Sequence, residues 1–172
     1  MDAIKKLAKE IAAAVEGVTE EELAFSPVEG KWSAAQVLEH LQRTYTGTSK
    51  GLERALEAGK PMAAPVPWKK QVFQWVVIGC GYFPKGRKSP KVAEPRGDVN
   101  PMELPLTIQE KLAEMDGLLE ECEQKFGGGK VLDHPILGAL TARQWRKFHL
   151  VHGRHHVKQV RRAVSGFRFR VS

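Results

Sequence analysis

FHLVHGRHHVKQV, residues Phe148 to Val160, contains four of the six histidines of the chain. Apolar residues recur around it at the spacing of one helix face, and Thr141 is a good N-cap upstream. The pattern predicts a last helix from Thr141 to about Ser165. A helix of this length with one apolar side must pack against other helices to bury that side. Its expected packing residues are Trp145, Phe148, Val151, Val157 and Val160.

Three further long helices are expected, over residues 4–15, 33–59 and 107–126, with Thr107 as the cap of the last of these. Ser33 with Gln36 has the spacing of a capping box, and Thr19 with Glu22 opens a short helical turn in the same way. A buried helical segment is expected over 68–82, after a proline-rich connector. Residues 83–106 contain five prolines and two glycines, which predicts a long irregular loop.

These elements indicate an all-α four-helix bundle with an additional short helical segment and a long irregular loop. The length of 172 residues fits a single domain spanning 1–172. No hairpin signal stands out, so residues 130–140 are expected to form a loop. The apolar faces of such a bundle are compatible with a homodimer.

The charge and the cysteines narrow the class of protein. The 27 Lys and Arg against 20 Asp and Glu give a net charge of +7, but the basic clusters lack the interleaved aromatic residues of a nucleic-acid surface. Nucleic acid is therefore disfavoured as a partner. No apolar run approaches the roughly 20 residues of a membrane span. Two isolated cysteines and no signal-peptide pattern indicate a cytoplasmic protein.

Three of the four histidines of the last helix share one face, and the fourth does not. At about 100° per residue, His149, His152 and His156 lie nearly in line, whereas His155 lies about 100° from His156. Two histidines four residues apart on a helix can bind one metal ion, but they hold it weakly without a third ligand. The same spacing arises in basic amphipathic helices whose histidines are solvated. Spacing alone leaves a metal site and a solvated face both open.

His40 offers a third ligand from another helix. Val37, Leu41 and Thr44 occupy the stripe expected to face the core, so the His40 ring is expected to point into the bundle. Inward histidines on facing helices are a common way to build a metal site in a bundle. Three imidazoles leave coordination positions open and suit zinc, nickel, copper or ferrous iron. Glu39, about 100° away on the helix, is expected to be a solvated charge.

Two motifs resemble elements of a known group of proteins. Gly30-Lys-Trp-Ser33 followed by Gln36-Val-Leu-Glu-His-Leu41 resembles the GKWS and ELxHL element of the DinB/YfiT-like superfamily of small metal-binding four-helix proteins. His152-Gly-Arg-His-His156-Val-Lys-Gln159 resembles its HxxxHRGQ signature, with Val-Lys in place of Arg-Gly. An uncharacterised branch with the pattern HPxxGxLT…W…H..H..HH..Q is more similar still. Its residues here are His134-Pro135, Gly138, Leu140-Thr141, Trp145, His149, His152, His155-His156 and Gln159.

The resemblance implies a divalent metal ion (zinc, nickel or iron) held by His40, His152 and His156. Gln159, three residues beyond His156, and His149, one turn before His152, are the best placed residues to orient the ligands. His155 either borders the site or turns out of the bundle into solvent, and His134 either lines the mouth of the pocket or caps the following turn. Members of the superfamily perform thiol-dependent transfer, thiol-dependent isomerisation and metal-assisted amide hydrolysis. The expected function is metal-dependent transfer or hydrolysis of a small-molecule substrate, with a low-molecular-weight thiol as a candidate cosubstrate. The alternative is a non-catalytic, stress-associated metal-binding protein, and catalytic residues are not assigned.

The predicted loop over residues 83–106 is a candidate lid for such a site. Long loops in compact domains are often functional. Lys85, Arg87 and Lys88 give this one a positive charge that would favour an anionic substrate or thiol.

Overall fold

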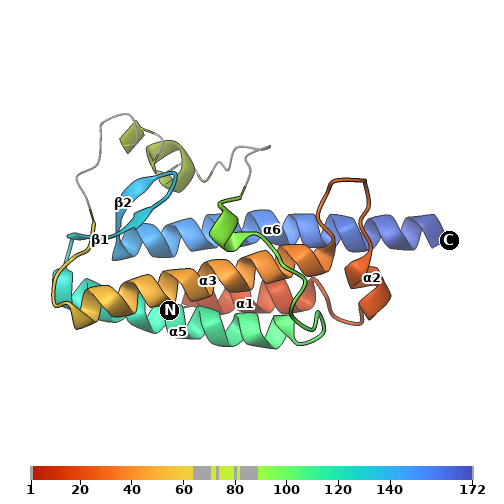
Figure 1. Cartoon of the computed structure of the whole chain (residues 1–172), viewed down its shortest axis with the longest axis horizontal. Coiled ribbons are helices and arrows are strands. Elements are labelled where there is room, and N and C mark those ends of the chain that lie inside the picture. Colours follow the sequence, from red (N-terminus) through yellow and green to blue (C-terminus); the bar gives the residue numbers. More distant parts are fainter. Residues whose placement is uncertain (1, 64–70, 73, 80, 82–88, 172) are drawn as a thin grey trace.

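Four long helices run side by side and form the body of the molecule (Figure 1). The computed structural model describes residues 2–63, 71–72, 74–79, 81 and 89–171. The long helices are α1 (Asp2–Ala13), α3 (Ala34–Glu57), α5 (Leu104–Phe126) and α6 (Ala142–Val171). α6 extends past the other helices toward the C-terminus, where the short α2 (Glu20–Ala24) contacts it (Figure 1). The predicted all-α bundle is confirmed, and none of the described helices is long and apolar enough to span a membrane.

Capping boxes fix where the helices begin. The Ser33 hydroxyl accepts a bond from the Gln36 amide, and the Gln36 side chain accepts one from the Ser33 amide, as the sequence predicts. Thr141 and Gln144 form the same reciprocal pair before α6. α3 packs against both α5 and α6, so its start at Ala34 places His40 about two turns along the helix and beside α6.

A small β-hairpin stands where the sequence predicts a loop. β1 (Lys130–His134) pairs antiparallel with β2 (Gly138–Thr141), with an irregularity between Lys130 and Leu132. The prediction was wrong because strands this short carry little local signal, and tertiary contacts hold them. The Gln74 side-chain amide donates to the carbonyls of Leu137 and Ala139, and the Trp145 indole N–H donates to the Leu132 carbonyl.

Other boundaries differ from the sequence-based prediction or are only partly described. α6 continues to Val171 instead of ending near Ser165. α5 begins at Leu104 instead of at Thr107, since Pro105 is tolerated in the first turn of a helix. The expected loop therefore ends at Glu103, and its described part contains η2 (Lys91–Ala93). In the expected buried segment over 68–82, residues 71, 72 and 74 are helical and η1 (Trp75–Gly79) is a π-helical turn. Residues 68–70, 73, 80 and 82 of that segment lie outside the described residues, and so do residues 83–88 of the candidate lid, among them 85, 87 and 88.

Gly153 allows α6 to approach α1 and α3 closely. A Cβ atom at this position would lie 2.6 Å from a Leu7 methyl carbon and 2.9 Å from the Tyr45 hydroxyl, and both side chains are fully buried. We expect Gly153→Leu to lower the free energy of unfolding by about 2–3 kcal/mol, since a packed core cannot absorb the added volume without strain. Urea unfolding measures this loss.

Gly117 provides the matched control, because it lies exposed on α5 and a Cβ atom added there would meet no atom within 4 Å. Gly117→Leu is expected to be neutral or to stabilise by up to about 1 kcal/mol through helix propensity. Equal effects of the two substitutions would contradict the close approach at Gly153.

Candidate metal centre

Three histidine side chains from two helices converge inside the bundle. His40 comes from α3, and His152 and His156 lie four residues apart on α6. The His152 Nε2 atom lies 3.3 Å from Nε2 of His40 and 3.0 Å from Nε2 of His156. All three rings are buried, and one ligand atom from each lies within 4.8 Å of the others. The structure therefore excludes the solvated-face interpretation of these histidines.

The outer nitrogens of two of these rings have hydrogen-bond partners that orient them. The His40 Nδ1–H donates to the Ala93 carbonyl at 2.7 Å, and the Ser89 hydroxyl lies 3.4 Å from the same nitrogen. The His156 Nδ1–H donates to the Gln159 side-chain oxygen at 2.6 Å. With the proton on Nδ1, each ring presents the Nε2 lone pair to the cluster, which is the tautomer that a metal ligand needs.

Burial keeps these rings neutral. Desolvation lowers the pKa of His156 from 6.5 to about 3, with a further contribution from His40. Desolvation and the neighbouring histidines hold the pKa of His152 well below its usual range. The pKa of His40 is lowered by desolvation, which the bond to Ala93 partly opposes. Neutral imidazole is the form that binds a metal ion, so the ligand form of the cluster persists into acidic solution.

The donor set fits a divalent cation. Two imidazole nitrogens bound tetrahedrally at about 2.0–2.1 Å from one ion lie roughly 3.3 Å apart, close to the 3.0 and 3.3 Å separations in the cluster. Buried lone pairs that face one another repel unless a proton or a cation lies between them. A cation bound to all three nitrogens would remove this repulsion.

The other predicted histidines lie around the cluster and are not part of it. Gln159 donates its side-chain N–H to Nε2 of His155, so this glutamine links His155 to His156. His149, fully buried one turn before His152, bonds through Nε2 to the Thr48 hydroxyl at 3.2 Å.

His134 has a structural role in the hairpin. Its Nδ1 accepts two bonds, from the backbone amides of Ile136 and Leu137. The ring packs on Phe148, with 4.5 Å between ring centroids, and Phe148 in turn stacks on His152. The ring is thus two aromatic contacts away from the cluster.

Residues that the sequence did not indicate complete the surroundings of His40. Trp32 packs on the ring, with 5.2 Å between centroids. Glu39 was expected to be solvated, and that prediction was wrong: the residue is 2% exposed, and its side chain accepts bonds from the amides of Arg96 and Gly97. Its position in the motif before His40 was the available signal, but helical geometry alone cannot show that a distant loop covers it.

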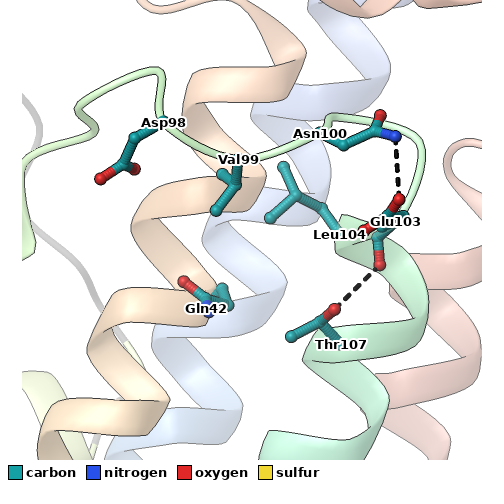
Figure 2. A pocket seen from close by; sticks show the side chains of 7 residues that line it. All are labelled: Gln42, Asp98, Val99, Asn100, Glu103, Leu104 and Thr107. Carbon is teal, nitrogen blue, oxygen red and sulfur yellow. Dashed lines mark hydrogen bonds between the residues drawn. The ribbon is translucent and has the colours of Figure 1, made fainter.

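A separate hollow opens beside α3 (Figure 2). Its volume is about 230 Å³, and none of the histidines lines it. Its walls are Gln42, Asp98, Val99, Asn100, Glu103, Leu104 and Thr107. The Asn100 side-chain N–H donates to the Glu103 carboxylate across one edge of the hollow. The hollow therefore does not belong to the metal centre.

The protein has a YfiT-like four-helix fold, and a buried three-histidine cluster lies inside it. The structure is similar to that of YfiT from Bacillus subtilis, described as "a probable metal-dependent hydrolase with an unusual four-helix bundle topology". That match has a TM-score of 0.62 at 18% identity and covers 94% of this chain and 82% of YfiT. The chain belongs to the protein family of unknown function DUF1569, whose model matches residues 5–163. It is also 26% identical over 152 residues to the uncharacterized protein YuaE of Bacillus subtilis strain 168, covering 86% of each chain.

Proposed function

We propose that this protein is a metal-dependent hydrolase or transferase of a small molecule, with a divalent ion held by His40, His152 and His156. The observation that carries the proposal is the convergence of three buried imidazole nitrogens from two helices. The fold shared with YfiT supports it, since YfiT is described as a probable metal-dependent hydrolase. Three neutral ligands leave the positive charge of the ion uncompensated, which favours catalysis over a purely structural role.

A bound divalent ion would supply a Lewis acid and lower the pKa of water or of a thiol toward neutrality. The protein's own residues hold and orient the ligands. Ala93 and Gln159 keep the Nδ1 protons of His40 and His156 in place, and Trp32 covers one ring. Such supporting contacts typically change metal affinity by about 10–100-fold.

Low exposure favours a second candidate, a metal-binding protein without turnover. The three histidines are only 4%, 5% and 7% exposed, which limits the access of a substrate to the described part of the site. Both candidates require the ion. They differ in whether a loaded protein converts a substrate.

Metal analysis and activity assays test the proposal in sequence. Purified protein is stripped with a chelator, reloaded separately with zinc, nickel or ferrous iron, and analysed by mass spectrometry. We expect about one ion per chain. The loaded forms are then assayed for amide and ester hydrolysis and for transfer of a low-molecular-weight thiol to an electrophile.

Metal-dependent turnover that disappears on stripping and returns on reloading supports the enzyme. One bound ion with no turnover in either assay favours the binding protein. Failure of every metal to bind at stoichiometry would refute both proposals.

A further inference from the structure

Residues 89–97 form a strap that crosses α3 and covers the His40 ring. Three side chains of α3 hold it, and each binds its backbone. His40 donates to the Ala93 carbonyl, Arg43 donates to the Val92 carbonyl at 3.3 Å, and Glu39 accepts from two amides of the strap. Ala93 is buried, while most of the other strap residues are exposed. The strap is therefore held mainly through its own main chain, which bonds to side chains of α3.

Glu39 makes the strongest of these anchoring contacts. One carboxylate oxygen accepts from the Arg96 amide at 2.6 Å, and the other accepts from the Gly97 amide at 2.9 Å. Two adjacent amides directed at one anion form a backbone nest, and here Gly97 has a φ of +73°. Arg43 is the nearby cation, at 3.8 Å from the carboxylate. A buried carboxylate needs such bonds, because leaving it unpaired would be costly.

Glu39 and His40 bind the same strap from adjacent positions. The carboxylate fixes residues 96 and 97, and this places the Ala93 carbonyl where the His40 Nδ1–H can donate to it. The bond to Ala93 keeps the His40 proton on Nδ1 and leaves Nε2 free to face His152. If the strap detached, the His40 ring would lose its orienting acceptor.

We infer that Glu39 is a positioning residue for the metal site: by anchoring the strap over residues 89–97, it sets the tautomer and orientation of His40. The inference rests on the proposed function only for its metal-binding consequence. Since coupling between two binding events is reciprocal, a metal ion bound at the cluster also stabilises the strap on α3.

Glu39→Gln tests the anchor with almost no change in shape. A carboxamide can accept only one of the two amide bonds and directs its own N–H groups at the other amide. We expect zinc affinity, measured by chelator competition, to fall about tenfold or more. Hydrogen exchange at the Arg96 and Gly97 amides should accelerate, and zinc should slow it in the wild type. Glu123→Gln is the control, because it disturbs ion pairs with Arg143 and Arg146 away from the cluster. It should leave zinc affinity unchanged, and also the exchange of the two amides with and without zinc.

Gly97→Ala tests the other partner of the same contact. A Cβ atom added here would meet no atom within 4 Å, so the substitution strains only the left-handed backbone of the nest. We expect the same direction of change in zinc affinity and exchange as for Glu39→Gln. Gly59→Ala is the matched control, because Gly59 also has a positive φ of 64° and open space but lies just beyond the far end of α3. It should leave zinc affinity within about twofold of the wild type, since no supporting contact of the site is lost.

The ¹⁵N shifts of the His40 ring separate this inference from the proposed function. In metal-free wild-type protein they should report a single Nδ1–H tautomer, and in Glu39→Gln a mixture of tautomers. Wild-type protein that binds none of zinc, nickel and ferrous iron refutes the proposed function, and the tautomer measurement still decides the role of Glu39. The inference is overturned if both variants fold, keep the single tautomer and bind zinc as tightly as the wild type. If Glu39→Gln does not fold, the same criteria apply to Gly97→Ala alone.

Discussion

Replacement of His152 by alanine should weaken zinc binding by more than about a hundredfold, beyond the typical effect of losing an orienting contact. His152 has the largest expected effect of the three ligands because its Nε2 lies within 3.3 Å of both other Nε2 atoms. Without it, only His40 on α3 and His156 on α6 would remain to bind the ion, and the ligand that lies close to both would be lost. Chelator competition and metal analysis of the purified variant measure the loss.

His155→Ala is the matched control for this experiment. His155 lies on the same helix, is half-buried and contacts Gln159, but its nitrogens do not join the cluster. Its loss should weaken zinc binding by less than about tenfold, because it removes only contacts with Gln159 and with the edge of the His156 ring and no ligand. Retention of stoichiometric zinc in His152→Ala would show that the three histidines are not the ligands.

Acid should unfold the metal-free protein at a pH where most proteins of this size remain folded. Burial lowers the pKa of His149 and of His156 to about 3 in the folded chain, from the ordinary 6.5. Below about pH 6.5 the unfolded chain therefore binds protons that the folded chain excludes, so stability falls as the pH decreases. The loss levels off only near pH 3, where the folded rings protonate as well.

The size of the stability loss in acid follows from the lowered pKa values of His149 and His156. Each ring costs about 1.4 kcal/mol of folding free energy per pH unit, so about two units below pH 6.5 the pair removes about 5 kcal/mol. Total stabilities of small domains are about 5–15 kcal/mol. The lowered pKa values of His40 and His152 act in the same direction. Urea unfolding of chelator-treated protein at about pH 7.5, 6.0 and 5.0 measures the dependence.

A variant and a metal titration check the origin of this acid sensitivity. His149→Leu removes one of the four groups, so the slope of stability against pH should decrease by about 1.4 kcal/mol per unit. Saturating zinc should raise the free energy of unfolding at every pH measured, because a ligand that binds only the folded state stabilises that state. Stability that is constant over this pH range would contradict the buried, neutral state of these rings.

Local sequence signals determined the helices and much of the site. The N-caps predicted at Ser33 and Thr141 mark helix starts that the structure reproduces, because caps act through bonds between residues three apart. The four-residue spacing of His152 and His156 fixes their shared face for the same reason: helical geometry is local. The apolar stripe around His40 made it the candidate third ligand, and the family motifs implied the same residue.

Only the tertiary structure decided which groups meet. The convergence of His40 with the α6 histidines depends on the packing of α3 against α6, which residues 112 positions apart cannot reveal by spacing. The hairpin depends on Gln74 and Trp145, and the burial of Glu39 depends on a strap that crosses α3 from more than about fifty residues later in the chain. The sequence thus determined the elements and their faces, whose bonds are local. The fold determined the partners of the buried polar groups, because each partner is brought from far along the chain by the packing of the bundle.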